Sequence, residues 1–226
     1  MNLADFIIKC HQDPQYRINT CYSIINKDSQ IVPFKLNKQQ QYIWDNRHTR
    51  NLVLKARQIG STTFWCMYFL DKAIWQDNQT IGIISHKMES AQNIFRRMRF
   101  AVDSMHPDIK DCIGVKQDSA RQLIFKNNSI IQVDTTMRSE TLSGLLISEF
   151  GRIAAHYPAK AEEIMTGSLN TLSKNAECVI ESTAEGIDGP FYEMCQKAIS
   201  GNNDDLTKLD FKFFFFPWWE FGEYTL

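Results

Sequence analysis

Short apolar segments alternate with amphipathic segments along most of this chain. The apolar runs have the length and β-rich composition of buried strands, and they cover residues 51–55, 80–85, 144–148, 177–182 and 210–216. Segments with helical periodicity or helix-start signals lie around them and predict helices over 38–47, 61–75, 87–105, 158–172 and 189–200. This alternation predicts an α/β domain built on a mainly parallel sheet.

Two regions depart from the alternation. Residues 122–135 hold two strand-like runs around Asn127 and Asn128, which predicts an inserted, antiparallel β-hairpin. Residues 2–11 predict a short helix, whereas 12–35, which contain Pro14 and Pro33, predict an irregular connection. We therefore expect an N-terminal extension over 1–35 that packs on a domain of residues 36–217, with the start of a linker at 218–226.

Composition narrows the class of protein. The 226 residues include 25 lysines and arginines against 26 acidic residues, so the net charge of −1 excludes a wholly cationic nucleic-acid binder but not a local basic patch. The six cysteines lie far apart and have no metal-binding spacing, which favours a reducing compartment. No run approaches the roughly 20 apolar residues of a membrane span. We expect a soluble, intracellular protein.

The strongest chemical signal is the segment KARQIGSTT at 55–63, which joins the first buried strand to a helix. Phosphate-binding loops have this placement, and their usual spelling is GxxxxGK[ST]. When the second glycine is aligned on Gly60, Ser61 replaces the lysine and Thr62 keeps the Mg²⁺-binding hydroxyl. Lys55 and Arg57 flank the loop and offer cations to phosphates. An ordinary strand–turn–helix junction with solvated cations explains this segment equally well.

Two further strand ends carry polar groups. GLLISEFGRI at 144–153 ends its strand with Ser148 and Glu149. Glu149 can polarise an attacking water, whereas Ser148 can bond a metal-bound water but brings no charge, which weakens Mg²⁺ affinity. VIESTAEG at 179–186 ends its strand with hydroxyl residues, where open α/β sheets bind ligands. Taken alone, each segment is also explained as a solvated strand end or turn.

In this order the segments resemble the large terminase subunits of tailed bacteriophages, the ATP-driven motors that package DNA. The resemblance extends from about Phe34 to Trp219. PFKLNKQQQYIW (33–44) resembles the segment beside the adenine, and KARQIGSTT resembles a deviant phosphate loop with its lysine at the start. LLISEFGRI resembles the acidic strand, ESTAEG resembles the motif that couples hydrolysis to movement, and PWWE (217–220) resembles the end of the ATPase domain.

The resemblance implies a RecA-like P-loop fold, with ATP and Mg²⁺ as cofactors. The implied catalytic residues are Glu149, which activates water, and Arg57, which senses the γ-phosphate. Thr62 would bind Mg²⁺ directly, Ser148 would do so through water, and Ser182, Thr183 and Ala184 would couple hydrolysis to movement. The implied ATP-binding set is Lys55, Ala56, Arg57, Gln58, Ile59, Gly60, Ser61, Thr62, Thr63 and, at the adenine, Gln40.

In the family, this module drives double-stranded DNA into a procapsid from a ring docked on the portal protein, and a small terminase subunit delivers the DNA. An RNase-H-like nuclease domain follows it there. The present sequence stops just past Trp219, so we expect no nuclease activity, and we expect 218–226 to begin the linker to that domain. The expected location is the host cytoplasm, with no membrane association.

Other basic residues leave alternatives open. Arg96, Arg97 and Arg99 form a cluster on a predicted helix that either grips DNA phosphates or is a solvated face. Arg138 either contacts nucleotide or a neighbouring subunit, or forms an ion pair with Glu140.

Two other functional classes also remain. One is a helicase-like DNA translocase on the same fold. The other is a P-loop interaction module that does not hydrolyse ATP, which the serines at positions 61 and 148 favour.

Overall fold

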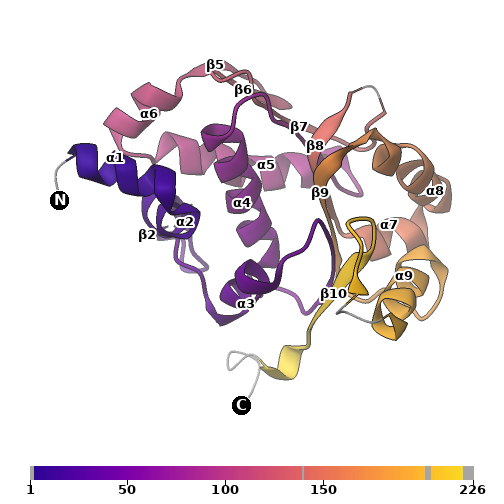
Figure 1. Ribbon diagram of the computed structural model, residues 1–226. Coiled ribbons are helices and arrows are strands. Elements are labelled where there is room, and N and C mark those ends of the chain that lie inside the picture. Colours follow the sequence, from indigo (N-terminus) through magenta and orange to yellow (C-terminus); the bar gives the residue numbers. More distant parts are fainter. Residues whose placement is uncertain (1–2, 139, 202–204, 221–226) are drawn as a thin grey trace.

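A single twisted sheet forms the centre of the molecule. The computed structural model describes residues 3–138, 140–201 and 205–220, and within them eight strands pair in the order β10-β3-β9-β8-β4-β7-β6-β5 (Figure 1). Every pair from β10 to β7 is parallel, whereas β7, β6 and β5 pair antiparallel. The prediction of a mainly parallel sheet with an inserted hairpin is therefore confirmed.

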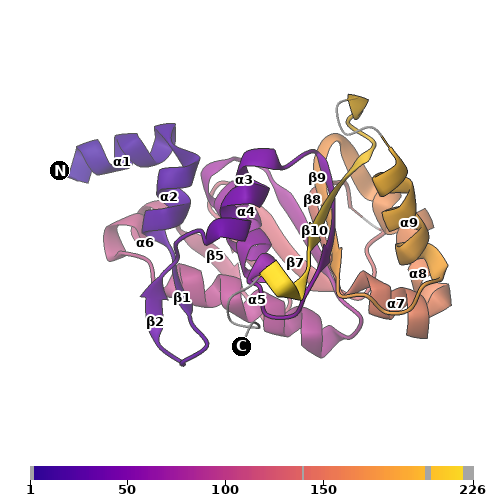
Figure 2. The same ribbon diagram turned by 90° about the horizontal axis from the view of Figure 1, so that it is seen from below.

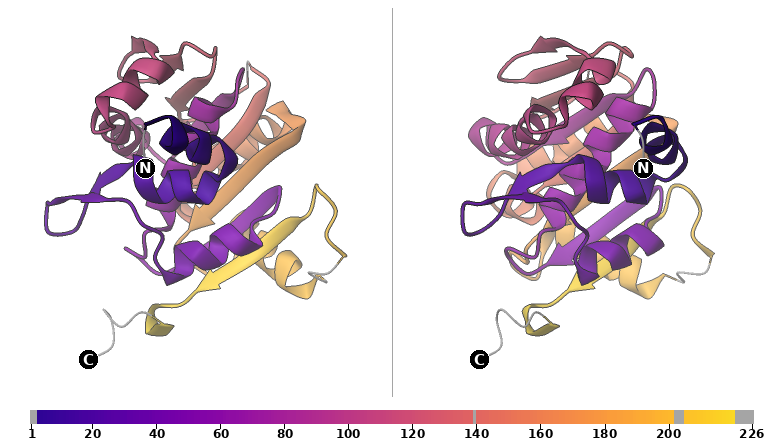
Figure 3. Two further views of the ribbon diagram at one scale, coloured as in Figure 1. Left: turned by 60° about the vertical axis from the view of Figure 1, so that its left-hand side comes forward. Right: turned by 90° about the vertical axis from the view of Figure 1, so that its left-hand side faces the viewer.

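The strands of this sheet are β3 (Arg50–Lys55), β4 (Thr80–Ile84), β5 (Val115–Asp118), β6 (Gln122–Phe125), β7 (Ile130–Asp134), β8 (Leu142–Ser148), β9 (Leu172–Ser182) and β10 (Phe211–Phe216). A separate antiparallel ribbon of β1 (Ser23–Ile25) and β2 (Ile31–Pro33) projects from the body of the molecule (Figure 3).

Helices cover both faces of the sheet (Figure 2). One layer contains α1 (Leu3–Gln12), α2 (Pro14–Cys21), α3 (Lys38–Asn46), α4 (Ser61–Trp75), α5 (Met88–Asp103) and α6 (Pro107–Ile113). The other contains α7 (Phe150–His156), α8 (Pro158–Thr166) and α9 (Gly189–Ser200), with the short 3₁₀ turn η1 (Ser168–Thr171) after α8. A second 3₁₀ turn, η3 (Trp218–Glu220), follows β10. None of the described helices is long and apolar enough to cross a membrane.

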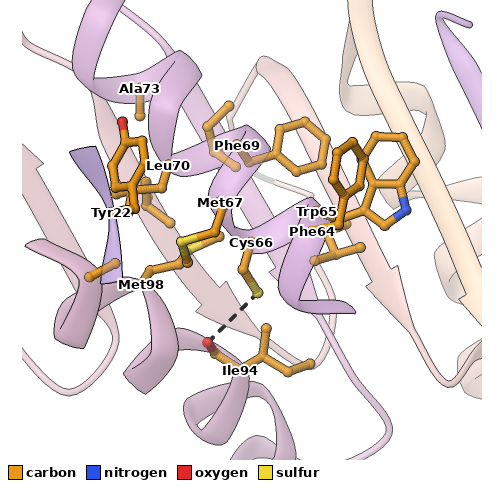
Figure 4. Close-up of a cluster of buried hydrophobic side chains, with 14 of the residues drawn as sticks. Tyr22, Phe64, Trp65, Cys66, Met67, Phe69, Leu70, Ala73, Ile94 and Met98 are labelled. Carbon is orange, nitrogen blue, oxygen red and sulfur yellow. Dashed lines mark hydrogen bonds between the residues drawn. The ribbon is translucent and has the colours of Figure 1, made fainter. Parts of the chain in front are cut away.

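Helix α4 forms the centre of the larger hydrophobic core. It is apolar almost all round, as expected for a helix enclosed by other elements. Figure 4 shows Cys66 and Met67 of this helix facing Ile94 and Met98 of α5, and Leu70 beside Tyr22 of the N-terminal segment. Phe64, Trp65 and Phe69 are completely or almost completely buried. The Cys66 thiol lies 3.9 Å from the Ile94 carbonyl oxygen, and burial raises its pKa to about 12, so it is an inert packing group. The rigid core fixes the first turn of α4.

The prediction of an irregular connection over 12–35 is wrong. Asp13 caps α2, because its side chain accepts a hydrogen bond from the Tyr16 amide at 2.9 Å, and Pro14 occupies the first turn, where its missing N–H costs nothing. The proline starts a helix here instead of preventing one. Residues 23–33 then form the β1–β2 ribbon. The predicted linker at 218–226 falls partly on 221–226, which lie outside the described residues.

Smaller differences concern the ends of elements. Helix α8 stops at Thr166 instead of continuing to 172, and β9 already begins at Leu172, upstream of the predicted strand. Helices α6 and α7 and strand β5 were not expected from the hydrophobic pattern, because they are too short for a period to be visible.

Candidate nucleotide-binding site

The carboxyl ends of the parallel strands meet along one edge of the sheet. In the strand register, Leu54 at the end of β3 lies opposite Ser182 of β9, and Glu181 lies opposite Ser148 of β8. A cavity of about 1110 Å³ opens at this edge, and the whole segment from Arg57 to Thr63 lines it together with Lys55 and Glu149. The structure thus brings together the loop and the acidic strand end that the sequence pattern singled out separately.

The loop after β3 leads directly into the first turn of α4. Gly60 has a left-handed backbone (φ +82°) and precedes the helix without a side-chain cap. The first N–H groups of a helix have no intrahelical acceptors, and together with the helix dipole they favour an anion. The first turn of this fifteen-residue helix therefore suits phosphate oxygens.

Helix α3 holds the loop from the other side. The Gln40 side-chain Nε2 donates to the Gly60 carbonyl oxygen at 2.9 Å, and Asn37 Nδ2 donates to the Ile59 carbonyl oxygen at 3.3 Å. A Cβ atom on Gly60 would lie 2.7 Å from Gln40 Nε2, so this close approach requires glycine. Gln40 Oε1 accepts from the Asn37 amide as part of a capping box. In this structure the amide group of Gln40 holds the loop. The contact with adenine predicted for Gln40 stays a prediction.

Cationic side chains surround the cavity. Lys55 is buried, and its Nζ lies 3.8 Å from Glu149 Oε1. Arg57, Arg96, Arg97 and Arg152 also line the cavity. This concentration of positive charge gives a polyanion a favourable potential although the whole chain is nearly neutral.

His86 lies at the same cavity. Burial, and then the nearby charges of Arg152, Lys87 and Lys160, lower its pKa below the ordinary histidine value. The imidazole is therefore neutral at pH 7 and contributes no charge.

Glu149 occupies a strained backbone position. It connects β8 to α7 with φ 61° and ψ 40°, a left-handed conformation that costs a non-glycine residue about 1–2 kcal/mol. Its side chain is one-third exposed, at 33%, and reaches the cavity. Strain of this kind clusters at functional sites, where the position of the side chain matters more than local stability.

The coupling residues lie beside α7. Ser182 is completely buried, and its Oγ has no hydrogen-bond partner among the described residues. A Cβ atom on Gly151 would lie 2.9 Å from this oxygen and 3.1 Å from the Thr183 carbonyl oxygen. The end of β9 therefore packs closely against the helix that begins after Glu149, while Ala184 is exposed in the following loop. The predicted coupling role stays a prediction.

The three arginines of the predicted DNA-binding cluster do not act alike. Arg97 Nη1 donates to Thr63 Oγ1 at 3.2 Å, and Arg96 lines the same cavity. Arg99 instead forms an ion pair with Asp118, with 2.8 Å between Nε and Oδ1. Two of the three side chains thus lie at the phosphate loop.

The ion pair considered for Arg138 and Glu140 is not formed. Arg138 Nε lies 3.0 Å from Glu163 Oε1 on α8, and Glu140 Oε2 accepts from Gln132 Nε2 instead. Gly167 permits this arrangement, because a Cβ atom there would lie 2.9 Å from Arg138 Nε.

One residue of this site, Glu181, is not predicted from the sequence motifs. Glu181 in β9 is completely buried, and it accepts hydrogen bonds from Ser61 Oγ at 2.6 Å and Thr62 Oγ1 at 2.5 Å. Ser148 Oγ of β8 donates to the same carboxylate at 3.2 Å. In the sequence, this residue could have been noticed as a charged side chain within the apolar run of 177–182.

The donor set at this point suits Mg²⁺. The ion prefers oxygen ligands, keeps several waters, and usually binds one or two carboxylates plus substrate phosphates instead of a protein cage. The Thr62 hydroxyl and the carboxylate of Glu149 line the cavity and supply oxygens of this kind beside the phosphate loop. Ser148 and Glu181 are buried, and Glu181 is hydrogen-bonded to both Thr62 and Ser148. The described residues contain no cluster of three or more His, Cys, Asp or Glu side chains able to hold a metal by themselves.

The sequence matches no family model, and no curated protein is similar to it in sequence. Solved structures with a similar fold are found, however. The large terminase ATPase domain of Thermus phage P74-26 superposes with a TM-score of 0.62 at 17% identity, covering 83% of this chain and 83% of that domain.

Two longer proteins have the same fold. The large terminase of bacteriophage HK97 superposes with a TM-score of 0.66 at 16% identity, covering 84% of this chain and 41% of that one. The large terminase of a thermophilic bacteriophage, in complex with ADP, gives 0.50 at 12% identity, covering 80% and 45%. The chain thus spans less than half of these two terminases. It has the RecA-like fold of large terminase ATPase domains, as predicted.

Proposed function

We propose that this chain is the ATPase domain of a large terminase, which binds and hydrolyses ATP to drive double-stranded DNA into a viral procapsid. One observation carries the proposal. The open first turn of α4, the cations Lys55 and Arg57, and the carboxylate of Glu149 converge on one cavity, in a fold shared with terminase ATPase domains. The ADP-bound terminase of the thermophilic bacteriophage supports ADP or ATP as the occupant.

The geometry is compatible with the roles that we propose for these residues. The N–H groups at the start of α4 and the side chains of Lys55 and Arg57 bind the phosphates, and Arg57 also responds to the γ-phosphate. Thr62 would hold Mg²⁺ directly and Ser148 would hold it through water. When bound, Mg²⁺ would neutralise the negative charge of the phosphate oxygens. Glu149 accepts a proton from the attacking water.

Movement would start where β9 meets α7. Ser182 and Thr183 contact the first turn of the helix that follows Glu149. A change at the γ-phosphate that moves Glu149 would therefore also displace the end of β9. This contact supports the coupling role proposed for Ser182 and Thr183, whereas the role proposed for Ala184 rests on the resemblance of the ESTAEG segment alone.

The partners are proposed with the function. They are double-stranded DNA, a portal protein, a small terminase subunit and further copies of this chain in a ring, and the proposed location is the host cytoplasm. If Arg96, Arg97 and Arg99 grip DNA, replacing all three by alanine lowers the slope of log affinity against log salt by about 0.9 for each phosphate that is no longer neutralised. An unchanged affinity and slope would rule out this surface.

The central experiment compares nucleotide binding and turnover in three variants. Lys55→Ala should lose most nucleotide affinity, because a phosphate-binding cation is removed from a buried position. Glu149→Gln should bind ATP normally but hydrolyse it about 10²–10⁴-fold more slowly. Lys72→Ala is the control, because Lys72 pairs with Glu177 at 2.7 Å in a different cavity. If Lys55→Ala and Glu149→Gln both match the wild type, the assignments are wrong.

The same measurements separate the alternatives. Strand separation accompanying DNA-stimulated hydrolysis would favour a helicase-like translocase, because a packaging motor moves the duplex intact. Nucleotide binding without turnover in the wild type would favour a P-loop interaction module that does not hydrolyse ATP.

A further inference from the structure

Glu181 is a buried acidic side chain whose bonding partners are all neutral. Ser61 and Thr62 of α4 and Ser148 of β8 donate to its carboxylate, and the residue is completely shielded from solvent. None of the ion pairs found in the described ranges includes Glu181. Burying a charge is costly unless an opposite charge accompanies it. The arrangement is therefore electrostatically incomplete without a cation.

We propose that the buried carboxylate of Glu181 positions the hydroxyl groups that would hold Mg²⁺, so that β9 supplies the negative charge that Ser148 on β8 does not bring. The inference rests on the proposed function and adds a residue to its site. Glu181 acts as a positioning residue: it accepts the hydroxyl protons of the first turn of α4 and so presents their oxygens to the cation that accompanies the nucleotide.

The hydrogen bonds to Glu181 also determine which way the lone pairs of the two hydroxyl groups point. A hydroxyl has one proton and two lone pairs. Because Thr62 Oγ1 directs its proton to Glu181 Oε1 at 2.5 Å, its lone pairs point elsewhere, and Thr62 lines the cavity. Ser61, at the usual lysine position, is held in the same way by Oε2 at 2.6 Å. The carboxylate thus fixes both hydroxyls as acceptors toward the cavity.

The strand register explains how a neighbouring strand can provide the missing charge. Glu181 lies directly opposite Ser148 in the parallel β8–β9 ladder, and Ser148 Oγ is 3.2 Å from Glu181 Oε1. A carboxylate on either residue would therefore lie close to the same Thr62 hydroxyl. The negative charge at this point of the site therefore comes from β9 and not from β8.

The experiment measures the affinity of a fluorescent ADP analogue in EDTA and in Mg²⁺. The wild type should bind more tightly with Mg²⁺. Glu181→Gln should lose about 10–100-fold of the affinity measured in Mg²⁺, as is typical when the partner of a metal ligand is removed, and little of the affinity measured in EDTA. Glu177→Gln is the matched control, since Glu177 lies on the same strand but pairs with Lys72 and Tyr68, and it should behave as the wild type.

A double variant separates positioning from structural damage. Glu181→Gln combined with Ser148→Asp returns a carboxylate to the neighbouring strand, so Mg²⁺-dependent affinity should recover. If Glu181→Gln does not fold, Glu181→Asp withdraws the carboxylate by one methylene, and a smaller loss in Mg²⁺ is expected.

The outcomes are distinct. If Glu181→Gln, or Glu181→Asp in its place, binds in Mg²⁺ as tightly as the wild type, or if Ser148→Asp restores nothing, the inference is overturned while nucleotide binding stands. If the wild type binds no nucleotide in either buffer, the proposed function fails, and the inference fails with it.

Discussion

Helix α4 contacts one buried carboxylate near each end, and the two are balanced in different ways. Near its C-terminal end, the helix's own Asp71 receives 2.7 and 2.6 Å hydrogen bonds from the Arg17 guanidinium and a 2.8 Å bond from the Tyr22 hydroxyl. At its N-terminal end, Glu181 receives hydroxyl protons only. The first charge is neutralised within the chain, and the second is not.

This difference separates a structural group from a ligand-binding one. Arg17 belongs to α2, so its bidentate contact ties the N-terminal segment to the core helix. Glu181 links α4 to the sheet through hydrogen bonds from hydroxyl groups. In our proposal, its charge is balanced by the cation that accompanies the nucleotide. Of these two buried acidic residues, Asp71 therefore stabilises the fold, whereas Glu181 is proposed to serve ligand binding.

The largest expected effect comes from breaking the structural pair. Arg17→Met leaves Asp71 buried without its cation and should lower the free energy of unfolding by about 3–5 kcal/mol. Arg17→Met combined with Asp71→Leu should recover most of this loss, because no isolated charge remains. Urea denaturation measures both. A loss below about 1 kcal/mol in the single variant would show that the pair does not anchor α2.

A second prediction uses the ligand. At about 100 times its dissociation constant, Mg²⁺–nucleotide should raise the free energy of unfolding of the wild type by about 2.7 kcal/mol. At the same ligand concentration, Glu181→Gln should show only the smaller rise given by nucleotide in EDTA. Asp71→Asn should keep the full rise relative to its own lower baseline. Equal rises in all three proteins would remove the contrast between the two carboxylates.

Relief of strain gives a third, smaller effect. Glu149→Gly removes the cost of the left-handed backbone and should raise the free energy of unfolding by about 1 kcal/mol. Turnover should be lost, because the carboxylate is gone. Glu149→Gln is the control, since it loses turnover but keeps the strain and should not be stabilised. A destabilised glycine variant would show that the conformation is not strained.

The smallest effect is expected at an exposed ion pair. Arg99 and Asp118 are each about one-third exposed, at 35% and 37%, so Arg99→Ala should change the free energy of unfolding by less than about 1 kcal/mol. The contrast with Arg17→Met is then a direct measure of what burial adds to an arginine–aspartate pair. A loss as large as that of Arg17→Met would contradict it.

Local pattern predicts the parallel strands of the central sheet but not every element around them. Runs such as 144–148 and 177–182 are apolar because both faces of a parallel sheet are covered, so their strands were visible in the sequence. The hydrophobic pattern does not predict helix α2, because Pro14 is typical of a helix break, although Asp13 before it is an N-cap signal. The Asn37–Gln40 capping box is another local signature that is visible in the sequence.

The site was only partly accessible from sequence. The loop around Gly60 and the strand end at Glu149 follow from local motifs, and the structure places them on one cavity. Glu181 could not be assigned in the same way, because its partners come from α4 and from β8. Only the register of the sheet brings Ser148 opposite it.

The bonds from α3 to the phosphate loop also have a mechanical consequence. Gln40 and Asn37 hold the loop carbonyls, and Tyr42, further along α3, packs edge-on against Phe214 and Phe216 of β10. Loop, helix and edge strand are therefore linked by direct contacts through α3. We therefore expect a displacement of the loop to reach β10, the edge strand beside β3, through the packed rings of Tyr42, Phe214 and Phe216.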